Sequence, residues 1–597
     1  MMKPVFSRIV ASLFLGLTAL AAQAQTITFI HFNDLHAHLT PHLDVIRDEQ
    51  GHVHYEERGG LARLDTLIKQ IRAENPDSVL MNVGDTTHGG VEALFTNGNA
   101  VIDPVNALGI DVGVPGNWDY AYGPDVFRLR YVENLGPMEK RMLGIRGAGD
   151  IQRFNFPNLA ANVTFTFPFY KAGKTILPPT LSKTIGGVKV GFIGLTSDIV
   201  PLMHKMLAVG MDFKQGELAH REIVQKYAHQ LRNEGAQIVV VMSELGLQKD
   251  KQLADGLEPG LVNVFFSAHT HETVFKPIVT RSGTRVVEAG NDGWLGRMDV
   301  SFDNGKVTGY NWKLLPVDDK IKPDPAMQAL VDKARAPFLK DDPNMVLKEP
   351  GIHLELHQSI ATVIGHVAHT LERRNSLEST FNDAWADALR RGENTELAMT
   401  PGFRFDAVVP GYEDAHAAKG DITIEDAFRY FPVPYTLGQA KANGKRLEDI
   451  LEDALSSVYS PDAFSQHGGW VDGISGLHVD LDLSAPDGKR VKSIRLADGE
   501  PLQKDRLYTV AGCLRPMDDP DVMCSNSGFV DVKPFINPQT GEPWQVVDYF
   551  EYVVKNGWLG DGRRHDMNDV SKRPQWPQAP YVQPLAAGVK ATPSAGN

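Results

Sequence analysis

The chain has 597 residues and a formal net charge of −14 at pH 7. This length predicts more than one domain, because single cores stop growing at roughly 250–300 residues. The acidic balance argues against a nucleic-acid surface, since phosphate binding requires clustered Lys and Arg side chains. Only two cysteines occur, Cys513 and Cys524, so any metal must be bound by nitrogen and oxygen ligands. A disulfide between the two is left open.

The first 24 residues have the layout of a cleavable secretory signal peptide. Lys3 and Arg8 give a basic start, residues 9–20 form a short apolar run, and residues 22–24 fit a small-x-small cleavage site. The run is shorter than the roughly 20 residues that a membrane helix needs, and no other apolar run is long enough to span a bilayer. We therefore expect export to the periplasm and no membrane span.

Short β-branched runs alternate with helical patterns from residue 25 to about residue 319. Several runs are apolar without alternation, which indicates strands buried on both faces. Strands that alternate with helices predict a layered α/β domain over residues 25–319. The expected strands are Thr26–Phe32, Ser78–Val83, Val112–Pro115, Val188–Leu195, Ile238–Met242 and Val262–Phe266, and the expected helices include Leu61–Ile71 and Ala219–Asn233.

A charged stretch with several prolines follows, and we expect a linker over residues 320–350 with a helix near Ala326–Leu339. A second domain with mixed helices and strands is predicted over residues 351–560. Residues 574–597 are rich in Pro, Ala and Gly, so we expect disorder there. The second domain's expected helices are Thr380–Arg391 and Gly444–Ser457, and its expected strands are Leu477–Leu483, Val491–Leu496 and Leu507–Ala511.

Five expected strands of the first domain end in side chains that can bind metal ions. In open α/β sheets ligands bind outside the carboxyl ends of the strands, so residues far apart in sequence can meet there. Each motif alone is a common turn or surface pattern, and it is the ordered set that predicts a metal centre. The candidate ligands are Asp34, His36, Asp85, Asn117, Glu244, His269 and His271.

The residue types and their spacing indicate how two ions could share these ligands. Two adjacent dications repel each other, so a carboxylate must lie between them, and Asp85 suits that bridging position. Asp34 and His36 are two residues apart and would point the same way on an extended chain, as would His269 and His271. Two ions about 3.5–4 Å apart can generate hydroxide and stabilise an oxyanion during in-line displacement.

These motifs resemble those of the calcineurin-like metallophosphoesterases, and the second domain resembles the 5′-nucleotidase C-terminal domain. The resemblance implies a four-layer β-sandwich flanked by helices, followed by a C-terminal α/β domain, with the substrate between the two. It also implies the distribution of the ligands. One ion would take Asp34, His36, Asp85 and His271, and the other would take Asp85, Asn117, His269 and the residue at the Glu244 position.

Two positions depart from the family pattern. Glu244 stands where the family usually has histidine; it is either a ligand or a solvated substitute beside a weak second site. Trp118 stands where nucleotidases have a histidine that assists the transition state or leaving group, and tryptophan cannot transfer a proton in this way. Asp119 follows it without its usual partner. His88 is a possible substitute, although a polar loop residue is the plainer interpretation.

A tryptophan at position 118 resembles the pattern of the thiosulfohydrolase SoxB branch. Members of that branch act in the periplasm with two manganese ions. They release sulfate from a cysteine-bound sulfonate on a carrier protein. Residues 400–404 (Thr-Pro-Gly-Phe-Arg) and 460–469 (Ser-Pro-Asp-Ala-Phe-Ser-Gln-His-Gly-Gly) resemble segments of that branch. The chain lacks that branch's twin-arginine signal and the long insertion after the first metal motif. It is therefore expected to be a divergent relative.

The second domain is expected to select the substrate. Arg404 is the best candidate to bind an oxyanion, since a guanidinium can bind two oxygens at once. The alternative is that Arg404 forms an ion pair at the surface. Gly468 and Gly469 could let the backbone approach the ligand closely. The candidate aromatic walls, most of which should belong to the core, are Phe431, Tyr435, Tyr459, Phe464 and Trp470.

Three functions remain open from the sequence. The expected one is a SoxB-like sulfohydrolase, in which a metal-bound water or hydroxide attacks a sulfonate on a SoxYZ-like sulfur carrier protein. The second is a 5′-nucleotidase or related phosphoesterase that hydrolyses nucleotides. The third is a non-catalytic metal-binding relic. We expect two divalent metal ions as cofactors, with manganese preferred and zinc or iron as alternatives.

Overall fold

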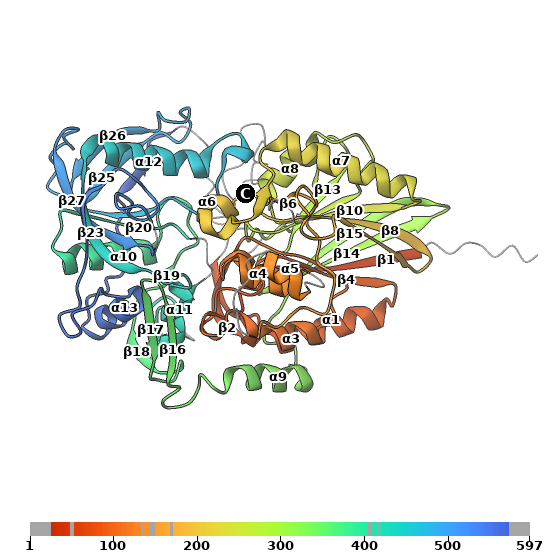
Figure 1. Ribbon diagram of the computed structural model, residues 1–597, viewed down its shortest axis with the longest axis horizontal. Helices are drawn as coiled ribbons and strands as arrows, with labels where there is room; N and C mark the ends of the chain where they lie inside the picture. Colours follow the sequence, from red (N-terminus) through yellow and green to blue (C-terminus); the bar gives the residue numbers. More distant parts are fainter. Residues whose placement is uncertain are drawn as a thin grey trace, which may run out of the picture.

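The computed structural model describes residues 25–47, 53–132, 136–142, 150–166, 171–403, 407–415, 418–516 and 518–571. The expected signal peptide, Arg404 and the C-terminal tail lie outside these residues. The described chain forms two lobes that lie side by side, with the first domain in red to yellow and the second in green to blue (Figure 1). Within the described part, no helix is long and apolar enough to cross a membrane.

Two sheets form the centre of the first domain. The strand order is β15-β14-β1-β4-β5 in one and β12-β13-β11-β10-β8-β7 in the other. In the first sheet, β1, β4 and β5 are neighbouring parallel strands. In the second sheet, β8, β10, β11 and β13 are neighbouring parallel strands. The bounds are β1 Gln25–Asn33, β4 Ser78–Val83, β5 Val112–Val114, β7 Thr180–Ile185, β8 Val188–Leu195, β10 Ile238–Ser243, β11 Val264–Ser267, β12 Ile278–Val279, β13 Arg285–Glu288, β14 Trp294–Asp303 and β15 Lys306–Pro316.

The two sheets pack face to face through large apolar side chains. Phe29 of β1 lies between Phe192 and Phe266 of the second sheet, with ring centroids 6.3 and 5.5 Å away. Every residue of β10 is buried, which explains its continuous apolar sequence. Helices α1 (Leu61–Glu74) and α3 (Ile102–Ala107) cover one outer face, and α7 (Glu217–Asn233) and α8 (Leu247–Asp255) cover the other. The predicted layered α/β domain is therefore confirmed.

Smaller elements complete the first domain. A hairpin of β2 and β3 follows the first ligand motif, and β6 pairs with β9 outside the main sheets. Helix α6 lies between the two lobes in Figure 1. The bounds are β2 His42–Arg47, β3 Val53–Arg58, α2 Val91–Leu94, α4 Pro124–Tyr131, α5 Pro137–Met142, β6 Val163–Phe165, α6 Val200–Met203 and β9 Met211–Phe213.

The second domain is built on a five-stranded sheet, β24-β20-β27-β23-β28, with a smaller sheet, β26-β25-β29. Helices α10, α12 and α13 bury their apolar faces in one continuous core with these strands. Cys513 and Cys524 are buried free cysteines in that core. The bounds are β18 Val363–His366, β19 Leu371–Glu372, α10 Thr380–Glu393, β20 Leu397–Thr400, β21 Val408–Val409, β22 Asp421–Thr423, α11 Ile424–Tyr430, β23 Thr436–Asn443, α12 Gly444–Tyr459, β24 Gly473–Ser475, β25 Leu477–Leu481, β26 Val491–Leu496, β27 Leu507–Leu514, β28 Val530–Pro534, α13 Val546–Lys555 and β29 Met567–Asp569.

The helix expected in the linker is α9, Pro325–Arg335. The Asp324 side chain caps it by accepting from the Ala326 and Met327 amides at 2.9 and 3.0 Å. Met327 and Val331 bury against the first domain beside α1, so the helix is part of that domain's outer layer. The hairpin β16 (Met345–Glu349) and β17 (Ile352–Leu356) then enters the second domain.

One partly buried and one fully buried ion pair join the two domains. Arg335 of α9 donates two hydrogen bonds to Glu425 of α11, at 2.9 and 2.6 Å. Arg374 binds Asp44 of β2 at 2.6 Å, and both side chains are almost fully buried. Removal of one partner from such a pair would leave the other charge buried and uncompensated. The contacts therefore fix the second domain against the end of the first domain that carries the candidate ligands.

Candidate metal centre

The structure brings the seven candidate ligands together at the carboxyl ends of β1, β4, β5, β10 and β11. In one group, His271 Nε2 lies 3.3 Å from Asp34 Oδ1 and 3.0 Å from His36 Nε2. His36 Nε2 is also 3.8 Å from Asp85 Oδ2. Five strands from two sheets thus converge on one small volume, as strand-end placement predicts.

A second group adjoins the first. Asp85, Glu244 and His269 each offer one ligand atom, and these atoms lie within 4.8 Å of one another. His269 Nδ1 is 3.7 Å from Glu244 Oε2. Asp85 is close to both groups, which is the position that a bridging carboxylate requires.

Most of these side chains extend from strained backbone. The φ angles of Asp34, His36, Asp85, His269 and His271 are 50°, 47°, 44°, 78° and 57°. Residues other than glycine rarely adopt this left-handed conformation, and such strain is concentrated at functional sites. The expected extended chain from Asp34 to His36 is therefore wrong. The two side chains meet because tight turns follow β1, and those turns could not be read from the two-residue spacing.

The described residues offset the charges of the site's carboxylates only in part. Among the described residues, both Glu244 oxygens and Asn117 Oδ1 are buried without a hydrogen-bond partner. Burial and the negative charges of Asp85 and Asp34 raise the pKa of Glu244 well above its usual value. Burial would raise the pKa of Asp34 too, but the charges of His271 and His36 hold it below its usual value. Clustered carboxylates with unpaired oxygens fit divalent cations.

Neighbouring groups fix the orientation of the ligands. Asp34 Oδ2 accepts from Asn33 Nδ2 at 2.6 Å and from the His269 amide at 2.9 Å. Asp85 Oδ1 accepts from the Trp118 amide at 2.8 Å. His36 Nδ1 lies 3.0 Å from the His88 carbonyl oxygen, which directs Nε2 toward the centre. These contacts set the ligand geometry before any ion binds.

Asp119 braces the loops and does not line the cavity. Its Oδ1 accepts from the Thr87 amide and hydroxyl at 2.9 and 2.8 Å, and its Oδ2 accepts from the Gly116 amide at 2.9 Å. This carboxylate thereby ties the loop after β4 to the loop after β5. A catalytic role for Asp119 stays a prediction, and in this structure its oxygens accept from Thr87 and Gly116.

A cavity of about 560 Å³ lies over the ligands, between the two domains. Trp118 and His88 form part of its wall, with their rings stacked at 4.9 Å and 12°. The second domain contributes Phe403, Tyr435, Gly468, Gly469 and Arg515. Of the predicted substrate residues, Tyr435, Gly468 and Gly469 therefore lie on the cavity.

Four of the predicted aromatic walls lie elsewhere. Phe431 is buried in the second-domain core against Trp385, with ring centroids 5.0 Å apart. Phe464 packs on the first domain, 5.7 Å from the His220 ring. Tyr459 and Trp470 are buried and do not line the cavity. Only Tyr435 of the five candidates lines the cavity, as expected if most of them belong to the core, because the sequence pattern does not distinguish a core aromatic from a cavity wall.

Residues on the cavity that sequence reasoning missed include Arg515 and Met203. Arg515 Nη1 donates to the Met203 carbonyl oxygen at 3.0 Å, which joins the loop after β27 to α6. Met203 Sδ in turn accepts from Asn117 Nδ2 at 3.3 Å. No motif marks either residue, so only the packing of the two domains reveals them.

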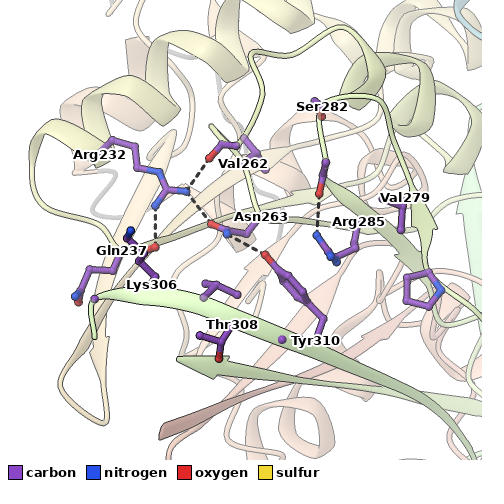
Figure 2. A pocket seen from close by; sticks show the side chains of 16 residues that line it. Arg232, Gln237, Val262, Asn263, Val279, Ser282, Arg285, Lys306, Thr308 and Tyr310 are labelled. Atoms are coloured by element: carbon purple, nitrogen blue, oxygen red, sulfur yellow. Dashed lines mark hydrogen bonds between the residues drawn. The ribbon is translucent and has the colours of Figure 1, made fainter. Parts of the chain in front are cut away.

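A second cavity lies at the opposite, amino-terminal edge of β10, β11 and β13 (Figure 2). Arg232 lines it, but its guanidinium donates to the Gln237 carbonyl and to Asn263 Oδ1, both at 2.8 Å. Arg285 donates to the Gly283 carbonyl at 2.8 Å and lies over the Tyr310 ring. The two arginines are bound to neutral acceptors of the protein, and none of the predicted site residues lies there.

Two family models match the chain. The calcineurin-like phosphoesterase model matches residues 27–273, and the 5′-nucleotidase C-terminal domain model matches residues 363–513. The chain belongs to the calcineurin-like phosphoesterase superfamily, in the arrangement that carries a 5′-nucleotidase-type C-terminal domain. Members of this family are metal-dependent hydrolases, and the calcineurin-like fold binds two divalent metal ions.

Individual relatives agree with this assignment. Endonuclease YhcR of Bacillus subtilis is 25% identical over 503 residues, which cover 81% of this chain and 36% of that protein. The chain thus spans about a third of that relative's length. The structure of the Thermus thermophilus sulfate thiohydrolase SoxB aligns with this chain with a TM-score of 0.72 and 20% sequence identity. The alignment covers 92% of this chain and 97% of the SoxB chain. A 5′-nucleotidase precursor, also from Thermus thermophilus, has a TM-score of 0.67 at 22% identity, with 92% and 100% covered.

Proposed function

We propose that the seven strand-end residues bind two divalent ions. Asp34, His36, Asp85 and His271 would hold one ion, and Asp85, Asn117, Glu244 and His269 would hold the other. The observation that carries this proposal is the buried group of three carboxylates, in which both Glu244 oxygens lack a hydrogen-bond partner among the described residues. A donor set rich in hard oxygens favours manganese over softer metals.

When bound, two such ions supply a nucleophile derived from water and neutralise the charge that develops on an oxyanion. The residues of this chain orient the substrate and exclude bulk water. Trp118 and Phe403 line the cavity from opposite domains. Arg515 of the second domain also lines the cavity, where its guanidinium pairs with Asp518 at 3.1 Å. This arrangement fits hydrolysis of a small anionic group attached to a larger body.

For the substrate, we propose a sulfonate bound to a cysteine sulfur, as on a sulfur carrier protein. Water adds oxygen to the sulfonate sulfur, the S–S bond breaks, and the thiolate leaves with the bonding electrons and then takes a proton. A thiol has a pKa of about 8.5, so its thiolate leaves with little help from a proton donor. The Trp118 ring at the cavity wall, which cannot donate a proton to a leaving group, supports this substrate over an alkyl phosphate.

A nucleotide is the second candidate substrate. The match of residues 363–513 to the 5′-nucleotidase C-terminal domain supports it, as does a cavity of about 560 Å³. Either substrate is consistent with a protein that acts in the periplasm after removal of residues 1–24, which we also propose.

One assay separates the two candidates. The manganese-loaded full chain is offered a cysteine S-sulfonate peptide and, separately, a nucleoside 5′-monophosphate. We expect release of sulfate and little release of phosphate, whereas the reverse result would establish the nucleotidase function. Asp85→Asn removes the proposed bridging charge and should abolish either activity. Asp103→Asn, at an exposed ion pair with Lys333, is the control that should leave it unchanged.

A further inference from the structure

A buried carboxylate outside the candidate ligand set joins the two strands that carry Glu244 and His269. Asp250 lies in α8, and its side chain is fully buried. Its Oδ1 accepts from the Ser243 hydroxyl at 2.6 Å, and its Oδ2 accepts from the Ser267 hydroxyl at 2.6 Å. Each oxygen of one carboxylate therefore binds a different strand.

The two serines stand at equivalent points of the sheet. Ser243 is the last residue of β10, Ser267 is the last residue of β11, and the two are paired in register. Glu244 follows Ser243 directly, and His269 comes two residues after Ser267. The Asp250 carboxylate thus spans the two strands at the last positions before their candidate ligands.

Helix α8 is itself held close to the candidate ligand loops. The Asp250 amide donates to the Gly246 carbonyl at 2.9 Å, which forms the first turn of the helix. Gly246 has a φ of +103°, and a Cβ there would lie 3.0 Å from Thr270 Cγ2, between the two candidate histidines. The Leu247 amide donates to Thr270 Oγ1 at 3.1 Å. The helix that carries Asp250 therefore contacts both loops and leaves little room for either to shift.

We propose that Asp250 is a positioning residue that sets the separation of Glu244 and His269 for the second metal ion. This inference rests on the proposed ligand set. Both Glu244 oxygens lack a hydrogen-bond partner among the described residues, and His269 has a φ of 78°, so the Asp250 carboxylate adds a fixed link between the two loops. Groups that orient metal ligands typically change metal affinity by about 10–100-fold when they are removed.

The test measures the two metal positions separately in the full chain. Wild type, Asp250→Asn, Ser243→Ala and Ser267→Ala are titrated with Mn²⁺ against a competing chelator, and bound metal is counted by mass spectrometry. Asp250→Asn should weaken the second Mn²⁺ by about 10–100-fold and leave the first within about 2-fold. Each serine variant removes one arm of the bridge and should give a smaller loss at the second ion alone.

Asp255→Asn is the matched control, because Asp255 ends the same helix but pairs at the surface with Lys251 and Arg281. It should bind both ions as wild type does. Urea unfolding of the metal-free variants shows whether a loss of metal follows from a loss of fold. If Asp250→Asn does not fold, the two serine variants decide the question.

Two results would overturn the inference. One is wild-type affinity at both positions in Asp250→Asn and in both serine variants. The other is an equal loss of both ions that follows the loss of stability, which would mean a purely structural role. Wild-type protein that binds fewer than two ions would instead overturn the proposed dinuclear site on which the inference depends.

Discussion

The ring of Trp118 in the first domain lies edge-on to the ring of Phe403 in the second, with centroids 6.1 Å apart and planes at 72°. This contact forms part of the wall of the cavity between the domains, beside the candidate ligands. The ring of His88 is stacked on the ring of Trp118 and also belongs to the cavity wall. The position next to Asn117 is thus filled by an aromatic group that packs and that cannot transfer a proton.

Replacing Trp118 with histidine should change which leaving groups are accepted. A general acid contributes about 10²–10⁴-fold when the leaving group is a poor one, such as an alkoxide. We predict that Trp118→His raises kcat/KM for a nucleoside monophosphate at least about 10-fold relative to that for a cysteine S-sulfonate peptide. Trp118→Phe keeps the packing without a proton donor and should leave the ratio unchanged. An unchanged ratio in Trp118→His would refute this account of the position.

Replacing Gly84 with alanine should disturb Glu244 directly. A Cβ at Gly84 would lie 2.0 Å from Glu244 Oε1, and its φ is +72°. We expect a loss of about 1–3 kcal/mol in the free energy of unfolding together with weaker binding of the second ion.

Gly187→Ala is the control for that substitution. Gly187 has a φ of +84° with nothing within 4 Å of the added Cβ. Its replacement therefore measures only the free-energy cost of placing alanine in this backbone conformation. The variant should lose only about 1 kcal/mol and bind metal normally. Equal behaviour of the two variants in urea unfolding and metal titration would show that Gly84 does not support Glu244.

Replacing Glu244 with histidine should alter the metal preference. Imidazole suits zinc better than a carboxylate does, and carboxylates suit manganese. We predict that Glu244→His retains more Zn²⁺ relative to Mn²⁺ than wild type when both metals are offered in equal amounts and the bound metals are counted. An identical ratio in the two proteins would indicate that Glu244 is not a ligand.

Glu393 of α10 provides a prediction about stability and pH. Burial raises its pKa from 4.5 to about 8, with Lys533 opposing the shift. The folded state therefore binds this proton more tightly than the unfolded state, and the associated stability is lost as pH rises from about 4.5 to 8. We predict that Glu393→Gln gains about 1–3 kcal/mol over wild type at pH 8 and much less at pH 5, by urea unfolding.

A surface substitution controls for a general effect of charge removal. Glu500 is exposed, so Glu500→Gln should show no such dependence on pH. If Glu393→Gln has the same advantage over wild type at pH 5 and at pH 8, the carboxyl does not titrate in this range.

The sequence predicted the layered domain and the convergence of the strand ends because both follow from local patterns. Continuous apolar runs gave the bounds of β4 and β8 as the structure has them. The carboxyl ends of parallel strands necessarily share an edge. Asp34 and Asp85 could therefore be grouped, although far apart in sequence, without knowledge of the tertiary fold.

The rest depended on tertiary packing. Phe431 and Tyr435 are close in sequence and equally aromatic, yet only Tyr435 lines the cavity. Asp119 lies two residues after a candidate ligand, but its oxygens accept from the Thr87 amide of the neighbouring loop and from the Gly116 amide of its own loop. Asp250 has no motif at all, since its partners are serines that lie together only because β10 and β11 pair in register.

The count of metal ions per chain tests the central claim most directly. The full chain is stripped with a chelator, loaded with Mn²⁺, freed of unbound metal and analysed by mass spectrometry. We predict two ions per chain in the wild type, and at most one in Asp85→Asn, because its bridging charge is shared by both positions. Fewer than two ions per wild-type chain after loading would contradict the dinuclear centre, and fewer than one would favour a metal-binding relic.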